Sequence, residues 1–423
     1  MQHNDIIDLL LQLAIMLACG RLLAEFMLKL KQPAVVGELL AGVLLGPTIL
    51  GHFDPEIFNG IFPSEGNAAV GLRGFIEVAV VLLLFIAGME VDLNVMWQLG
   101  RSALRTSLLG MLIPFLLGAA LPFAFSDYFP TEGTENWILA LFLGTAMSIT
   151  ALPVIARILM DLDLFRSRLG ILIIASAMMV DLVGWLIFSA ILSLIRQDPE
   201  QQAVWVTILL TLGFTLFMLT AGKWLISRSL SWIKNYMAWP GGMLSLSIAF
   251  CFLSAAFTEY IGLHAIFGAF IFGVALGDSE YFPENAKEIV HQFINNVFSP
   301  LFFVSIGLTI DFIADFDFSL TLLIIVISFA GKIIGSGFGT WLGGYHWRES
   351  LAVGFGMNAR GAMEIILGII ALEAGLITKP LLVALVIMAL LTSITSGPLM
   401  KWSLGSRIAR NPSTKSKVPP HDV

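Results

Sequence analysis

The sequence predicts an all-α membrane protein of about 13 transmembrane helices, arranged as two inverted repeats with two broken, crossing helices. Three observations predict this fold: an apolar composition, basic residues confined to alternate loops, and similar segments seven helices apart. Hydrophobic residues make up 57% of the 423 residues and charged residues only 13%, against about a quarter charged in soluble domains. The chain is therefore expected to cross the membrane many times.

Apolar runs of about 20 residues mark the spanning helices. The ninth run is short, and the tenth contains Pro300. We expect a transmembrane domain over residues 1–402 and a disordered cytoplasmic tail over residues 403–423. The thirteen runs are 6–28, 33–50, 75–93, 104–125, 137–159, 169–195, 203–225, 240–257, 263–277, 293–311, 320–342, 350–373 and 380–400.

Lysine and arginine are distributed unequally between the two sets of loops. The loops after the first, third, fifth, seventh, ninth and eleventh runs, with the tail, hold seventeen of the 23 basic residues. The opposite loops hold three, Arg73, Arg196 and Lys379. Because basic residues accumulate on the cytoplasmic side, we expect the N-terminus outside and the C-terminus in the cytoplasm, in the inner (plasma) membrane of the cell.

Two pairs of segments indicate an internal repeat. Residues 36–46 in the second run resemble 267–277 in the ninth, and residues 84–93 in the third resemble 303–312 in the tenth. An odd separation of seven helices makes the copies cross the membrane in opposite directions. Helices 1–6 and 8–13 are thus predicted to be inverted repeats, with helix 7 as the linker. Such repeats are typical of secondary transporters, whose sites lie where helices are broken.

The fifth run contains the first predicted break. Pro153 removes a backbone donor and disfavours a continuous helix. Ser148 and Thr150 lie just before it, and their hydroxyls can satisfy freed backbone groups or offer oxygens to a cation.

The second predicted break lies in the twelfth run, the corresponding place in the second half. Its centre is polar and flanked by glycines, with Asn358, Arg360 and Glu364 within seven residues. Arg360 and Glu364 have the spacing of a structural ion pair on one helix face. Two interrupted helices in matching positions indicate a transport site.

Asp181 is the only ionisable residue of residues 169–195 and lies near their middle. A charge at the bilayer centre costs several kcal/mol, so an acid there indicates function. The alternative is a permanently neutral Asp that hydrogen-bonds a neighbouring helix. Lys332 also lies in mid-helix, and a buried ammonium needs a partner. Asp181 and the polar breaks are the two candidate partners.

These residues predict competition between a proton and a cation. Protonated Asp181 is neutral, whereas ionised Asp181 requires a monovalent cation with oxygens from Ser148, Thr150 and backbone carbonyls, which are hard ligands. A site occupied by either ion and alternately exposed is an antiporter. A cation channel and a non-transporting ion or pH sensor remain alternatives. There is no nucleotide-binding motif, and we expect no enzyme activity, no cofactor and no nucleic-acid partner.

Segments along nearly the whole chain resemble the monovalent cation:proton antiporter family, in the branch of Kef-type potassium/proton antiporters and plant cation/proton exchangers. The matching segments are residues 32–38, 45–47, 148–157, Asp181, 300–307, 331–332 and 357–364.

The resemblance implies the thirteen-helix sodium/proton antiporter fold, a homodimer with helix 1 and its neighbours at the interface, and a core domain that carries the ion by an elevator motion. It implies that Asp181 is the cation/proton carboxylate, Ser148 and Thr150 its broken-helix ligands, and Lys332 a core cation. Many relatives place a polar or acidic residue before this Asp, where this chain has Val180. A single titrating acid favours electroneutral, one-for-one exchange. Sodium and potassium both suit oxygen ligands, and Val180 with the family likeness favours potassium.

Overall fold

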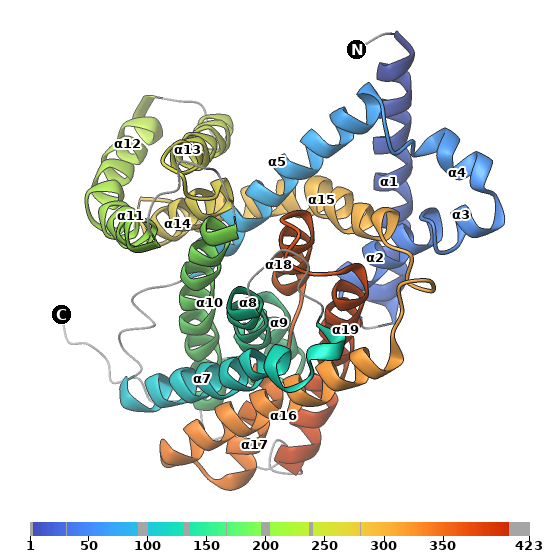
Figure 1. The fold of residues 1–423 in the computed structure, drawn as a ribbon. Coiled ribbons are helices and arrows are strands. Elements are labelled where there is room, and N and C mark those ends of the chain that lie inside the picture. The colour runs from blue at the N-terminus through green and yellow to red at the C-terminus, as the bar shows by residue number, and fades with distance from the viewer. Residues whose placement is uncertain are drawn as a thin grey trace.

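The computed structural model describes residues 3–30, 32–91, 100–129, 136–165, 167–195, 204–236, 240–279 and 281–405, and these residues form helices and turns without a strand (Figure 1). Most of the predicted tail, residues 406–423, lies outside this range. The helices are α1 (His3–Lys29), α2 (Ala34–Leu45), α3 (Leu50–Phe53), α4 (Pro55–Ile61), α5 (Asn67–Met89), α7 (Gly100–Ala124), η1 (Ser126–Tyr128), α8 (Asn136–Ser148), α9 (Leu152–Asp161), α10 (Arg168–Ile195), α11 (Val204–Phe217), the π-helical η2 (Met218–Gly222), α12 (Lys223–Tyr236), α13 (Gly241–Tyr260), α14 (Ala265–Gly277), α15 (Glu284–Thr309), α16 (Phe318–Leu342), α17 (Trp347–Met357), α18 (Ala362–Glu373) and α19 (Lys379–Leu404).

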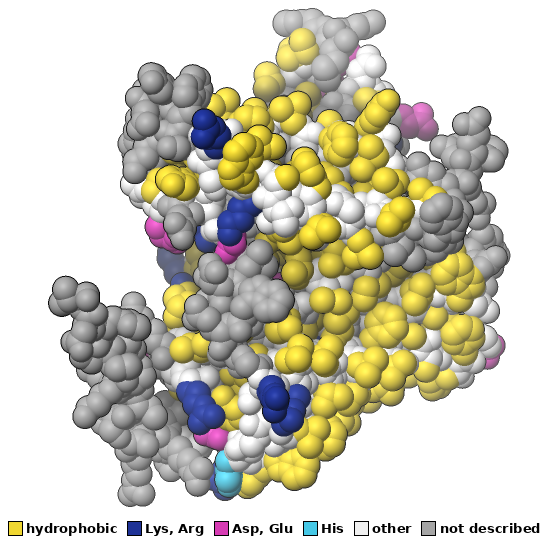
Figure 2. Space-filling view, turned by 90° about the vertical axis from the view of Figure 1, so that its left-hand side faces the viewer, with side chains coloured by type: hydrophobic (Ala, Val, Ile, Leu, Met, Phe, Trp, Pro, Cys, Tyr) yellow, Lys and Arg dark blue, Asp and Glu magenta, His cyan; other side chains and the backbone are white. Residues whose placement is uncertain are grey.

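The predicted all-α membrane fold is confirmed. In the described part of the chain, ten helical segments are long and apolar enough to cross a membrane, and each corresponds to one predicted run. The other three runs are the two interrupted ones, which form the pairs α8–α9 and α17–α18, and the short ninth run, which forms α14. Hydrophobic side chains also cover much of the described surface on the face drawn in Figure 2, as expected of a surface in contact with lipid.

The helices pack as two bundles joined by a linker (Figure 1). We call α1, α2, α5, α13, α14 and α15 the scaffold bundle, since α2 packs on α15 and α14 on α5. We call α7–α10 and α16–α19 the core bundle, in which α16 packs on α7 and α17 on α19. The linker α11–η2–α12 lies against α13 and α14. This arrangement places both broken helices in the core bundle.

Glycines permit two close helix crossings in the scaffold bundle. A Cβ atom on Gly42 of α2 or on Gly307 of α15 would collide with backbone atoms of the facing helix. The same holds for Gly88 of α5 and Gly273 of α14. Because α2 corresponds to α14 and α5 to α15 in the repeat, the two crossings are equivalent when the halves are exchanged. The glycines of the repeated segments therefore serve packing.

The broken helices begin and end at residues with identifiable local causes. Pro153 lies in the first turn of α9, where a missing N–H costs nothing because that donor has no partner within the helix. The chain breaks just before it, between Ser148 and Leu152. In the second half, His346 and Glu349 cap the start of α17 reciprocally. Four residues separate the end of α17 from the start of α18, and three separate α8 from α9, so neither pair is one continuous helix.

Candidate ion-binding site

The two breaks cross and are bonded to one another. The Ala151 amide donates to the Ala359 carbonyl over 2.9 Å, and the Thr150 hydroxyl donates to the Met357 carbonyl over 2.8 Å. These bonds join the first break to the second across more than 200 positions of sequence. The crossing is therefore one structural unit built from both halves of the chain.

Two basic side chains cap the C-terminal end of α8. The Arg360 guanidinium donates to the Ala146 carbonyl over 2.7 Å and to the Met147 carbonyl over 2.6 Å. The Lys332 ammonium donates to the Ser148 carbonyl. A helix C-terminus carries free carbonyls and a partial negative charge, which cations stabilise. The basic residues of the second half thus hold the end of the first half's broken helix.

The predicted pair between Arg360 and Glu364 is present, with Nη1 and Oε1 separated by 2.6 Å and both side chains buried. Lys332 takes the second of its two candidate partners, the break, and among the described ion pairs none joins it to Asp181. The Lys332 charge still acts on Asp181 through space. Lys332 therefore forms no described ion pair with the Asp181 carboxylate.

Asp181 lies on α10 with only 3% of its surface exposed. The backbone amides of Thr150 and Leu152 interact with its carboxylate from the break and from the start of α9, and a helix N-terminus stabilises an anion. Its Oδ1 atom is buried and has no hydrogen-bond partner in the described chain. A buried carboxylate oxygen without a partner is costly. A proton or a cation would remove that cost.

The other predicted site residues lie at the same crossing but in different roles. Thr150 is beside Asp181 and ties the two breaks together. Ser148 donates its hydroxyl to the Thr145 carbonyl over 2.9 Å, within its own helix, and no direct bond to Asp181 is described for it. Asn358 is fully buried, and neither polar atom of its amide has a hydrogen-bond partner among the described residues. Hydroxyl and amide oxygens keep lone pairs for a cation.

Glu90 is a residue that the sequence analysis did not single out. It caps the end of α5, and its charge acts on Asp181 from the scaffold bundle. Gly88, two residues before Glu90, belongs to the repeated segment and lies at the crossing with α14. The repeat alone does not show in which direction the Glu90 side chain points. Val180, in contrast, packs in a hydrophobic cluster of the core bundle.

A cavity of about 330 Å³ lies between the bundles and reaches the crossing. It is at the end of the molecule where α1 ends and α2 begins, which is the cytoplasmic end in the predicted orientation. On the core side it touches Ala151, Arg360 and Gly361. Its polar lining on the scaffold side consists of Arg21, Glu38, Glu90, Asn295, Asn296 and Ser299.

A second cavity, of about 620 Å³, lies between the bundles toward their opposite end. Glu77, Glu259 and His264 line it from the scaffold bundle and Glu373 lines it from the core bundle. Clefts lined by one sign of charge concentrate counter-ions. The boundary between the bundles therefore has a polar cavity toward each end.

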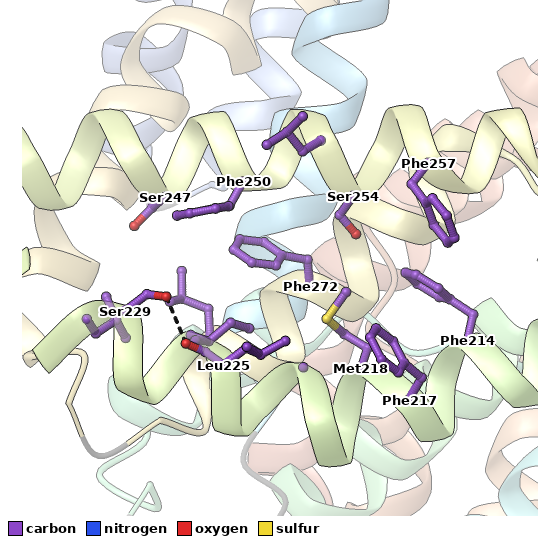
Figure 3. A pocket seen from close by; sticks show the side chains of 15 residues that line it. Phe214, Phe217, Met218, Leu225, Ser229, Ser247, Phe250, Ser254, Phe257 and Phe272 are labelled. Atoms are coloured by element: carbon purple, nitrogen blue, oxygen red, sulfur yellow. Dashed lines mark hydrogen bonds between the residues drawn. The ribbon is translucent and has the colours of Figure 1, made fainter. Parts of the chain in front are cut away.

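The apolar cavity beside the linker is a different kind of site. Its volume is about 390 Å³, and the side chains that line it include Phe214, Met218, Phe250 and Phe272 (Figure 3). No acidic or basic residue is among those that line it, and it lies against α11–η2–α12, α13 and α14, away from the breaks. It offers no charged group to an ion.

Two crossed broken helices beside a buried carboxylate define a secondary transporter built from inverted repeats. Residues 13–404 match the family model described as the transmembrane sodium/hydrogen exchanger. The chain belongs to the sodium/hydrogen exchanger family.

Similar proteins include bacterial and eukaryotic antiporters. The Na⁺/H⁺ antiporter NhaS4 of Synechocystis is 30% identical over 406 residues, covering 95% of this chain and 98% of that protein. The K⁺/H⁺ antiporter 1 of Saccharomyces cerevisiae is 30% identical, covering 91% of this chain but only 45% of the yeast protein. The Na⁺/H⁺-K⁺ antiporter GerN of Bacillus cereus is 28% identical, covering 94% and 96%. The solved sodium/proton antiporter MjNhaP1 of Methanocaldococcus jannaschii shares the fold, with a TM-score of 0.64, 18% identity and coverage of 96% and 98%.

Proposed function

We propose that this chain exchanges a monovalent cation, K⁺ or Na⁺, for H⁺ across the membrane by alternating access. The observation that carries the proposal is the Asp181 carboxylate, buried at the crossing with one oxygen lacking any described partner. Relatives at 28–30% identity are named for exchange of Na⁺, K⁺ or both with H⁺. Competition of the two ions for one carboxylate accounts for exchange without any covalent step.

In the first half of the cycle, Asp181 releases its proton to one side and its charge is balanced by a cation. The oxygens of Thr150, Asn358 and nearby backbone carbonyls replace water around that cation, as hard ligands suit an alkali ion. Lys332 and Arg360 stay at the end of α8 and do not compete for the carboxylate. In the other half, a proton displaces the cation and makes Asp181 neutral.

We further propose that the core bundle carries the site in an elevator motion past the scaffold bundle. The two cavities at the boundary support this, since each lies toward a different end of the bundles. Two copies would join through α1 and its neighbours. The exposed apolar side chains of α1, such as Leu10, Leu22 and Phe26, support such a contact within the bilayer.

The single carboxylate favours one cation for one proton. Val180 precedes Asp181 and lies in an apolar cluster, so it supplies no second titrating group. One-for-one exchange moves no net charge and is independent of membrane potential. Val180, with the Kef-type and plant-exchanger likeness, favours K⁺ as the preferred cation.

The test is exchange by the purified protein in liposomes that contain a pH dye, over a matrix of Na⁺ or K⁺ concentrations and pH values. A pulse of cation should drive proton movement, and clamping the membrane potential should leave the rate unchanged. Cation current without proton movement would replace the antiporter with a channel. Cation binding without either movement would make the protein a sensor.

Replacing Thr150 with Val removes the hydroxyl while keeping the shape of the side chain. We expect a roughly tenfold higher KM for the cation, because a lost buried hydrogen bond and ligand cost on the order of 1–3 kcal/mol and 1.36 kcal/mol is a factor of ten. The cation dependence of exchange in liposomes measures this.

The matched control is Thr150→Ser, which keeps the hydroxyl and should behave like the parent protein. Equal KM values for the Val and Ser variants would remove Thr150 from the site.

A further inference from the structure

Glu38 is a buried carboxylate that the proposed cycle does not use. It lies on α2 of the scaffold bundle with 4% of its surface exposed. Its Oε2 atom accepts a hydrogen bond from the Ser299 hydroxyl of α15 over 2.8 Å. Both residues line the cavity that reaches the crossing of the broken helices. Glu38 therefore faces the same polar space as the ion-binding site, from the opposite bundle.

The nearest base does not neutralise Glu38 by contact. One arm of the Arg21 guanidinium lies 2.5 Å from Oε1 of Glu25, and the other donates to Oδ1 of Asn296 over 3.0 Å. Among the ion pairs described in this chain, none includes Glu38. A buried carboxylate without a paired base is costly in its ionised form. It must take up a proton or a cation instead.

The surroundings of Glu38 suit either ion. Ser299 supplies a hydroxyl and Asn295 a side-chain amide in the same lining, whereas Oδ1 of Asn296 accepts from Arg21. These are the hard, neutral oxygen ligands that alkali cations prefer. Across the cavity lie Ala151 and Gly361 of the two breaks, so an ion leaving Glu38 enters the space next to the crossing.

We propose that Glu38 and Ser299 form a second, stationary site for a monovalent cation or a proton, from which Asp181 is loaded. This inference rests on the proposed antiport. When a cation passes from ionised Glu38 to Asp181, the proton of Asp181 passes to Glu38. Each carboxylate is balanced by one positive ion before and after the step, so charge and atoms are conserved. The scaffold site thereby couples loading of the cation to release of the proton.

The test is Glu38→Gln in membrane vesicles of both orientations, with exchange started by cation added to the bath. Gln keeps the acceptor for Ser299 but holds neither ion as a carboxylate does. At the face where this cavity opens, the KM for the cation should rise roughly tenfold, the lower end of what a charged cleft adds to ion capture. At the other face the KM should stay as in the parent protein.

Three variants make the outcome decisive. Glu288→Gln, an exposed carboxylate on the same end of α15, should leave both KM values unchanged. Glu38→Asp should recover part of the effect, and Ser299→Ala should give a smaller rise at the cavity face alone, which decides the matter if Glu38→Gln does not assemble. An unchanged KM, or an equal rise at both faces, would overturn the second site. If the parent protein itself exchanges nothing, the antiport proposal fails instead.

Discussion

We expect Asp181→Asn to lower cation/proton exchange at least about a hundredfold and to leave an assembled membrane protein. Asparagine has nearly the same shape, but it neither takes up a proton nor balances a cation. Removing the carboxylate charge from its buried pair with the bound cation costs about 3 kcal/mol, which corresponds to a fall of roughly a hundredfold in rate at low cation concentration. Exchange in dye-loaded liposomes measures the loss, and size-exclusion chromatography in detergent shows whether the variant is assembled.

The matched control for this variant is Asp163→Asn. Asp163 is exposed in the turn after α9 and has a φ of 56°, a left-handed conformation that Asn adopts readily. The same chemical change there should leave exchange intact. Exchange at the parent rate by Asp181→Asn would move the ion-binding site elsewhere in the chain.

We expect Arg360→Met to destabilise the protein more than any change at the proposed ion ligands. It removes the donors to the Ala146 and Met147 carbonyls and leaves the buried Glu364 without its base. Loss of one partner from a buried ion pair costs about 3–5 kcal/mol. A marked fall in the melting temperature in detergent, or loss of assembled protein, is the expected result.

The double variant Arg360→Met with Glu364→Met separates the contribution of the ion pair to stability from the contribution of the Arg360 cap on α8 to exchange. An apolar replacement of both partners is often neutral for stability, so the double variant should recover much of the lost melting temperature. It still leaves the end of α8 without two of its donors, so exchange should stay impaired. A single variant as stable as the parent protein would show that the cap contributes nothing to the fold.

The helices and the breaks were predictable because their causes are local. Hydrophobic length marks a span wherever it occurs, and Pro153 and the polar centre around Asn358 interrupt their own helices. The pair of Arg360 and Glu364 likewise joins residues only four positions apart, although Arg360 lies in the break and only Glu364 in α18. Contacts between residues far apart in the sequence could not be predicted from such local patterns. The choice of Lys332 between Asp181 and the break depends on how α16 approaches α8, which no local pattern fixes.

Glu90 and Glu38 show the same limit for the acids. Each lies near a helix end or a glycine of the repeat, and composition alone does not show whether its side chain faces lipid, protein or an aqueous space. Their role depends on which side of the helix faces the space between the bundles. That side follows from the close glycine crossings of α2 with α15 and α5 with α14, and only the assembled scaffold bundle defines it.

Two hydrogen bonds connect the breaks and have a mechanical consequence. One joins the Ala151 amide to the Ala359 carbonyl, and the other joins the Thr150 hydroxyl to the Met357 carbonyl. These bonds join the two broken helices at their non-helical centres, so the two breaks are expected to move together. In the proposed cycle, the ligands around Asp181 would then keep their mutual positions while they travel. The intrinsic affinity of the site for the cation would then be the same at both faces of the membrane.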